Sequence, residues 1–165
     1  MLIFKDLFSG DEICSDVYPC ETVEGCILKV TGKRVTKVQG GDYGIAGDEE
    51  DGGVEESSSV SVINVVDAHQ LVSTQFDKKN FMTYIKGYMK RLLEKLKANN
   101  PGRVEAFQKE AQEFVKKVLA NFKDYDFYLG PSNDVEAMVV LSTWAEDGVT
   151  PYFYFWKDGL AQEKV

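Results

Sequence analysis

The sequence predicts an α+β fold with an antiparallel or mixed sheet, because two segments of helical periodicity separate two groups of short strand-like segments. Between Asp77 and Phe122, apolar residues recur every three or four positions, with a break at the stretch NNPG. Before and after that region, β-branched and aromatic residues gather in short runs bounded by turn-forming residues. We therefore expect one domain over residues 1–165, built from a sheet body and an antiparallel helical hairpin.

The N-terminal part of the chain is predicted to form short strands and turns. The run LIFKDLF alternates loosely between apolar and polar residues, and DEICSD is typical of a polar turn. The run GCILKVTGKRVTKV has two β-branched segments around Thr31 and Gly32, which predicts a β-hairpin with its turn at these residues.

A glycine-rich acidic segment follows these strands. From Gly40 to Ser59 the apolar periodicity disappears, and the segment contains seven acids, no base and six glycines. This composition cannot bury much apolar surface, so we expect a long flexible acidic loop over about residues 40–60. The run VSVINVVDAHQLVSTQF then restores strand character and includes His69.

The segment over about residues 77–122 is predicted to be the helical hairpin. Each half has an apolar stripe with the spacing that marks one face of an amphipathic helix. Asn100 can cap the second helix and Pro101 suits its first turn, so the chain is expected to reverse there. The stripe residues are Phe81, Tyr84, Ile85, Tyr88, Met89, Leu92, Leu93 and Leu96 in the first helix, and Val104, Phe107, Ala111, Phe114, Val115, Val118, Leu119 and Phe122 in the second.

Three further strands are predicted after the hairpin, in the runs YDFYLG, AMVVLSTWA and PYFYFWKDGL. Asp147 and Gly148 supply the turn signal between the last two strands. The aromatic run from Tyr152 to Trp156 is predicted to place one face in the core and leave the other half-exposed.

Charge is distributed unevenly along the chain, whose net charge is −8. The segment from Asp77 to Lys123 contains 12 basic and 5 acidic residues, whereas the rest contains 7 basic and 22 acidic residues. We expect a basic hairpin on an acidic body, and the overall negative charge argues against nucleic acid as a partner. The basic side of the hairpin is either a solvated face or a docking site for an acidic partner, such as tubulin tails or a phosphorylated protein surface.

The distribution of apolar residues along the chain predicts where in the cell the protein is found. No apolar run approaches the roughly 20 residues that a membrane span needs, so we expect no membrane insertion. The start MLIFKDLFSGDE has too short an apolar stretch before Lys5 and Asp6 to be a secretory signal, so a cytoplasmic location is expected.

The residues give little support for an enzyme or a zinc protein. The sole histidine, His69, has no nucleophile motif near it, and the run GGDYGIAG lacks the GK[ST] of a phosphate-binding loop. The spacing of Cys14, Cys20 and Cys26 matches no zinc pattern, so no zinc is expected. We expect the three thiols to be half-buried, in a reducing compartment.

The acidic segment could hold calcium. Asp48, Glu49, Glu50 and Asp51 supply the oxygen ligands that this cation prefers, but the EF-hand pattern is absent. A loop that must lose chain entropy to surround an ion binds it weakly. The alternatives are therefore weak calcium binding and a solvated loop without a ligand.

Four stretches of the chain resemble the translationally controlled tumour protein family. They are MLIFKDLFSGDEICSD, YIKGYMKRLLEKL, VLANFKDYDFYLG and EDGVTPYFYFWKDGL, and they extend over essentially the whole chain in the same order. The resemblance implies a β-tent-like body, similar to that of Rab chaperones, with a protruding helical hairpin and a long flexible acidic loop. It also implies a growth-promoting regulator without catalytic activity that binds calcium, microtubules and a small GTPase of the Rheb or Rab type.

The resemblance also implies roles for particular residues. It assigns GTPase contact to Glu12, with Asp11 beside it, and calcium binding to the region from Asp48 to Asp51. The chain departs from the family pattern at Gly130-Pro131, where Gly-Glu is usual, and around GIAGDEEDG, where Gly-Gly-Asn-Pro-Ser-Ala-Glu is common. It also ends in Val165 where many relatives have the cysteine of a disulfide dimer, so we expect a monomer.

Two functional hypotheses follow for a protein without catalytic activity. The first is a regulator that binds a small GTPase through Glu12 and its neighbours. The alternative is a calcium-responsive microtubule-binding and microtubule-stabilising adaptor that acts through the basic face of the hairpin, formed by Lys86, Lys90, Arg91 and Lys97.

Overall fold

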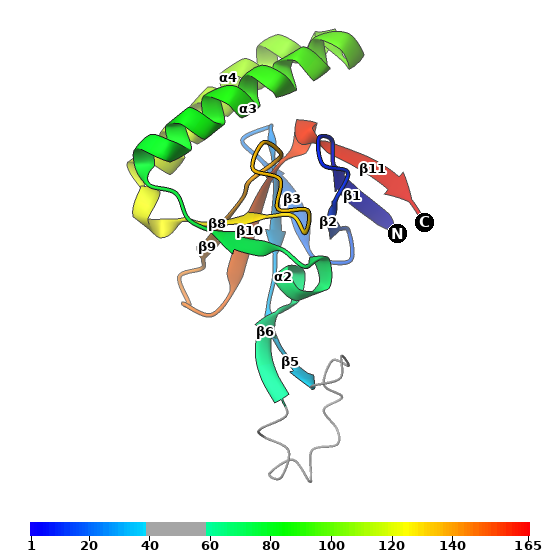
Figure 1. The fold of residues 1–165 in the computed structure, drawn as a ribbon, viewed down its shortest axis with the longest axis vertical. Helices are drawn as coiled ribbons and strands as arrows, with labels where there is room; N and C mark the ends of the chain where they lie inside the picture. The colour runs from blue at the N-terminus through cyan, green and yellow to red at the C-terminus, as the bar shows by residue number, and fades with distance from the viewer. Residues whose placement is uncertain (39–58) are drawn as a thin grey trace.

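The structure, a computed structural model, describes residues 1–38 and 59–165 and confirms the α+β class (Figure 1). The predicted acidic loop falls outside these residues, apart from Ser59 and Val60, which begin a strand. The strands are β1 (Leu2–Asp6), β2 (Glu12–Ser15), β3 (Cys20–Val23), β4 (Ile27–Thr31), β5 (Arg34–Val38), β6 (Ser59–Ile63), β7 (Val72–Thr74), β8 (Asp126–Leu129), β9 (Val140–Trp144), β10 (Pro151–Trp156) and β11 (Leu160–Lys164). The helices are α2 (Asn64–His69), α3 (Lys78–Asn99) and α4 (Val104–Ala120), with short 3-10 turns η3 (Pro101–Arg103), η4 (Phe122–Asp124) and η5 (Lys157–Gly159).

The described strands form three sheets in which neighbouring strands are antiparallel. A six-stranded sheet has the order β3-β4-β10-β9-β8-β7, a three-stranded sheet has the order β11-β1-β2, and β5 pairs with β6. Figure 1 shows α3 and α4 crossing one end of the sheets, with β5 and β6 at the opposite end. The hairpin and the strand pair are therefore well separated surfaces of one molecule.

Strand β10 lies within the large sheet and joins it to the helices. Phe153 and Phe155 are buried and Tyr152 and Tyr154 are half-buried, as predicted, but Trp156, on the same side of the strand as the tyrosines, is also buried. The Trp156 ring contacts the rings of Phe107 and Phe114 of α4 edge to face, with centroids 6.1 and 5.4 Å apart. Such pairs add to the free energy gained by burying the rings and fix α4 on the sheet.

The antiparallel helical hairpin predicted over residues 77–122 is present. Asp77 caps α3, because its Oδ1 accepts a hydrogen bond from the Asn80 amide at 2.7 Å. Asn100 does not cap the second helix with its side chain; its carbonyl instead accepts from the Arg103 amide at 3.0 Å, across the turn that Pro101 begins.

The prediction of a polar turn at DEICSD is wrong. These residues contain β2, whose Ile13 and Cys14 are almost completely buried. The backbone of β2 pairs with β1, although the polar composition of DEICSD does not indicate a strand. Strand character here is set by tertiary packing rather than by local propensity.

The predicted β-hairpin at Thr31 and Gly32 is also wrong. Both flanking strands exist, but β4 pairs with β3 and β10, whereas β5 pairs with β6. The chain passes from one sheet to another at Gly32, where an added Cβ would lie 3.0 Å from the Phe153 ring and 3.1 Å from Asn64. The glycine therefore permits a close approach instead of forming a hairpin turn.

Helix α2 replaces part of a segment predicted as strand. Asn64 Oδ1 accepts from the amides of Val65 and Lys33 at 2.8 and 2.9 Å, which starts the helix and fixes it to the link between β4 and β5. Gln70 ends it in the left-handed conformation, with a φ of 54°. This run thus forms a short helix whose start is held by Lys33 and whose end is closed by local hydrogen bonds from Gln70 and Leu71.

Candidate functional site

The Asp11 side chain is committed to holding a neighbouring loop. Its Oδ2 accepts from the Ser132 amide at 3.0 Å and its Oδ1 accepts from the Ser132 hydroxyl at 2.6 Å. An added Cβ at Gly130 would collide with the same carboxylate, so the glycine permits the contact. Asp11 therefore positions a loop across from β2, and each of its carboxylate oxygens accepts one hydrogen bond from Ser132.

Glu12, by contrast, is exposed at the start of β2. It forms no ion pair with any residue in the two described ranges, and Lys5, opposite it in β1, pairs instead with Glu163 of β11. The strand pairing on one side and the Asp11 contact on the other hold its backbone in place. Glu12 is thus an exposed negative charge on a held backbone, without an ion-pair partner among the described residues.

His69, at the end of α2, lies close to Glu12. The imidazole is 9% exposed and packs edge to face against the Tyr18 ring, with centroids 5.7 Å apart. Burial lowers the pKa of His69, while the charge and backbone carbonyl of Glu12 raise it by a smaller amount. The ring is therefore neutral at pH 7 and supports the contact between α2 and β2.

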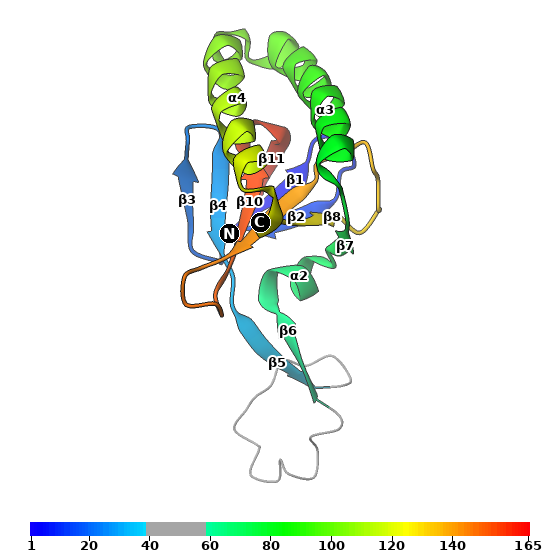
Figure 2. The same ribbon diagram turned by 90° about the vertical axis from the view of Figure 1, so that its left-hand side faces the viewer.

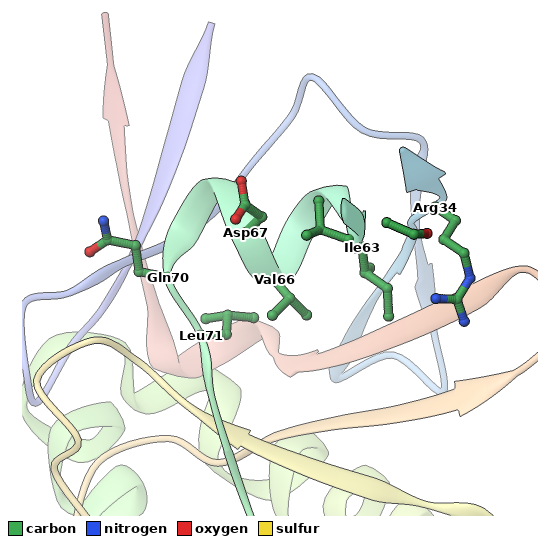
Figure 3. A pocket seen from close by; sticks show the side chains of 8 residues that line it. Arg34, Ile63, Val66, Asp67, Gln70 and Leu71 are labelled. Atoms are coloured by element: carbon green, nitrogen blue, oxygen red, sulfur yellow. The ribbon is translucent and has the colours of Figure 1, made fainter. Parts of the chain in front are cut away.

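A pocket of about 530 Å³ lies on α2, close to β5 and β6 (Figure 3). Figure 3 shows Val66 and Leu71 on one side of α2 and Asp67 on the other. Asp67 forms an ion pair with Lys37 at 3.1 Å. The pocket could not be predicted from the sequence, because a strand is expected where α2 forms. The lining residues are Arg34, Ser61, Val62, Ile63, Val66, Asp67, Gln70 and Leu71.

The predicted basic face of the hairpin is divided by the structure. Lys86, Lys90 and Lys97 are exposed on α3, and none forms an ion pair with another residue of the described chain. Arg91 is half-buried, its Nη2 donates to the Glu136 carbonyl, and its guanidinium lies 6.0 Å from the Phe8 ring centroid. Arg91 thus faces the body, and the other three form the surface that we call the lysine face.

Two other basic residues of the hairpin are neutralised by acids. Arg103 forms ion pairs with Asp158 and Glu110 at 3.0 and 2.7 Å, and Lys117 forms one with Glu24 at 2.7 Å. These contacts anchor the hairpin on the body and leave the lysine face outside them. The positive charge expected on the hairpin is therefore still exposed on α3, at the lysine face.

The predicted calcium ligands, Asp48, Glu49, Glu50 and Asp51, lie outside the described residues. Within the described residues, no group of three or more histidine, cysteine or acidic side chains could hold a metal ion.

Cys14 and Cys26 are buried, and burial raises the pKa of each thiol to about 12. Cys20, predicted to be half-buried like the others, is exposed. In the same described ranges, no helix combines the length and apolar character needed to cross a membrane.

Comparisons with known proteins agree with this fold. The family model for the translationally controlled tumour protein matches residues 1–161. A translationally controlled tumour protein homologue from Schizosaccharomyces pombe is 48% identical over 167 residues, covering 99% of both chains. The homologue from Saccharomyces cerevisiae is 45% identical over 169 residues, covering 100% of both.

Solved structures give the same result. The translationally controlled tumour-associated protein p23fyp from Schizosaccharomyces pombe matches with a TM-score of 0.85 and 48% identity, covering 100% of both chains. The solution structure of the protein from Caenorhabditis elegans matches with a TM-score of 0.71 and 28% identity, covering 100% of this chain and 99% of that one. Family model, relatives and structures agree, and the chain belongs to the translationally controlled tumour protein family.

Proposed function

We propose that this protein is a cytosolic regulator that acts by binding other proteins rather than by catalysis, and that it binds a small GTPase of the Rheb or Rab type through Glu12. The observation that carries the proposal is the exposed carboxylate of Glu12, which forms no ion pair within residues 1–38 and 59–165, beside an Asp11 whose carboxylate is bonded to Ser132. Membership of the family supports a regulatory role. The one imidazole, His69, is buried and packs edge to face against Tyr18, which suits a packing role better than a catalytic one.

The mechanism would depend on differential affinity. A binding protein shifts the GTPase between its nucleotide-bound and nucleotide-free states only if it binds one of them more tightly. Because the β1–β2 pairing and the Asp11–Ser132 contact already fix Glu12, little ordering free energy is lost when a partner docks. Any exchange activity would follow from tighter binding of the nucleotide-free GTPase.

The test is calorimetry with nucleotide-depleted and nucleotide-loaded GTPase. We expect tighter binding to the depleted form, and Glu12→Gln should weaken it by about tenfold, which corresponds to one charge-assisted contact. Glu21→Gln is the matched control, because Glu21 is an exposed acid on β3 and its replacement changes the net charge equally. Equal affinity for the two GTPase forms, or equal effects of the two variants, would contradict the proposal.

A second proposed function, microtubule binding, is favoured by the lysine face. Lys86 and Lys90 lie one helical turn apart, and both are exposed and unpaired within the described residues, so they suit acidic tubulin tails. Reversal of the three lysines of this face to Glu should reduce co-sedimentation with microtubules strongly, and salt should do the same. The control reverses three exposed lysines elsewhere on the hairpin: Lys78, Lys79 and Lys109.

We also propose weak calcium binding by the acidic segment, at Asp48, Glu49, Glu50 and Asp51. Clustered carboxylates support the proposal, because calcium takes several oxygen ligands. The test is an amide NMR titration with calcium.

A further inference from the structure

An apolar groove separates the two long helices. Figure 2 shows α3 and α4 lying apart and joined at one end. The groove has a volume of about 720 Å³, and both helices contribute to its lining. The lining residues are Met82, Ile85, Lys86, Met89, Lys90 and Leu93 of α3, and Phe107, Gln108, Ala111, Gln112, Val115 and Lys116 of α4.

The floor of the groove belongs to the buried core, and methionines contribute to its wall on α3. Ile85, Phe107 and Ala111 are buried in the core and form the floor. Met82 and Met89 are half-buried in the wall of α3. Methionine side chains adjust their shape readily, which suits a surface that receives an apolar partner.

The rims of the groove are positively charged. Lys86 and Lys90 line it on α3 and Lys116 lines it on α4, and no acidic residue from the described part of the chain lines it. Because the helices are antiparallel, Lys86 and Lys116 stand at similar distances from the turn at Pro101–Arg103. The charge therefore favours an occupant that is acidic along both flanks.

The groove also selects the backbone conformation of its occupant. Its walls are helix faces, whose backbone groups already bond within α3 and α4, so an extended peptide would find no sheet edge to pair with. An occupant must satisfy its own backbone polar groups, which a helix does. The α3 wall from Met82 to Leu93 is about 16 Å long, which matches about three turns of helix.

We propose that this groove binds an amphipathic acidic helix of a partner protein, about three turns long, with apolar residues at i, i+4, i+7 and i+11 and acidic residues on both sides of that stripe. The proposal is independent of GTPase binding at Glu12. It differs from the binding of tubulin tails, because it requires an apolar stripe as well as negative charge. An anionic membrane is the competing occupant, and the test below includes it.

The direct test uses the full chain with its methionine methyl groups labelled for NMR. Two of the four methionines, Met82 and Met89, line the groove, whereas Met1 and Met138 do not. The probe is a 15-residue peptide with Leu at the four stripe positions and Glu on both flanks. We expect the signals of Met82 and Met89 to shift with the probe while those of Met1 and Met138 stay in place.

Two control peptides separate the groove from simple charge attraction. One has the same composition in an order without an apolar stripe, and the other replaces each Leu with Ser. Both should bind about tenfold more weakly than the probe. If either binds as tightly, or if the probe leaves Met82 and Met89 unchanged at millimolar concentration, the proposal is wrong. It is also wrong if vesicles of phosphatidylserine and phosphatidylcholine shift both methyl groups and the probe does not.

Variants then test the two parts of the groove separately. Met82→Gln with Met89→Gln keeps side-chain length and should reduce probe affinity about tenfold by removing apolar contact. Lys86→Glu with Lys116→Glu should also reduce it, whereas Lys79→Glu with Lys109→Glu changes the same charge outside the groove and should have little effect. Equal losses in the two lysine pairs would overturn the assignment, and thermal unfolding checks that every variant is folded.

Discussion

The guanidinium of Arg103 makes two hydrogen bonds with the carboxylate of Asp158, from Nε to Oδ1 at 3.0 Å and from Nη2 to Oδ2 at 3.1 Å. Nη2 also donates to Glu110 at 2.7 Å and to the Gly25 carbonyl at 2.9 Å. Arg103 lies in the turn between α3 and α4, Asp158 lies in η5, and Gly25 precedes β4. One side chain therefore ties the turn of the hairpin to two parts of the body.

Asp158→Asn should destabilise the protein by about 1–2 kcal/mol, because its amide group would face the guanidinium with a donor. Lys117→Met is the control, since it removes the more exposed ion pair with Glu24 and should cost no more than about 0.5 kcal/mol. Urea unfolding of both variants measures the difference. Similar losses would show that the Arg103 contact does not anchor the hairpin.

The imidazole of His69 should titrate below its ordinary pKa of 6.5, because it is buried. Glu12→Gln should lower this pKa further by removing a nearby negative charge. A depressed histidine pKa means that stability is present above pH 6.5 and is lost as the pH falls through the folded-state pKa. NMR titration of this single histidine gives the pKa directly, and a higher pKa in the variant would contradict the placement of Glu12.

Asp6 should make stability decrease with rising pH. It is 3% exposed, and burial raises its pKa above the ordinary 3.8, although its oxygens accept from the amides of Phe8 and Met138 at 2.9 Å. The folded state then holds a proton that the unfolded state has released, so stability falls as the pH rises from 3.8 through the folded-state pKa.

Asp6→Asn removes that pH dependence and leaves an amide donor facing a backbone N–H, which should cost about 1–3 kcal/mol. Urea unfolding from pH 4 to pH 7 should therefore show the wild-type advantage shrinking as the pH rises. An advantage that grows over this range would contradict the assigned direction.

Tyr88 and Gly159 should show coupled effects on stability. The Tyr88 hydroxyl is buried without a hydrogen-bond partner among the described residues, so Tyr88→Phe should be neutral or stabilising by up to about 1 kcal/mol. Gly159→Ala should cost about 1–3 kcal/mol, because its Cβ would collide with that hydroxyl and lie 2.8 Å from Met138. In the Tyr88→Phe background the cost of Gly159→Ala should be smaller, and a double-mutant cycle that shows additivity would refute the contact.

Calcium should act on the acidic segment only at high concentration. In an amide NMR titration we expect shifts over residues 48–56 first, with an affinity in the high micromolar to millimolar range. Neutralising the four proposed ligands should abolish these shifts, whereas Glu21→Gln with Glu105→Gln should not. Shifts confined to other parts of the chain would contradict calcium binding by the acidic segment.

The features that sequence predicted correctly are those set by local periodicity and turn chemistry. The helical hairpin follows from apolar spacing, and the turn between β9 and β10 follows from Asp147-Gly148. Asp147 accepts from the amides of Val149 and Thr150 at 2.9 Å, and Gly148 has a φ of 74°.

The features that sequence missed depend on residues far apart in the chain. Helix α2 starts where Asn64 bonds to Lys33, and β2 is a strand because β1 pairs with it. Arg91 faces away from the lysine face because it donates to the Glu136 carbonyl, and the periodicity of the helix does not indicate this contact. The sequence therefore identifies the charged candidate residues, but it does not indicate which of them bond to other parts of the protein.

The most direct test of the account is the NMR signal of His69 during addition of nucleotide-depleted GTPase. Since this imidazole lies close to Glu12 and is the only one in the chain, docking there should shift or broaden its signal. The effect should be much smaller with nucleotide-loaded GTPase and absent with Glu12→Lys. Binding of the depleted GTPase that leaves the His69 signal unchanged would place the contact elsewhere and contradict the account.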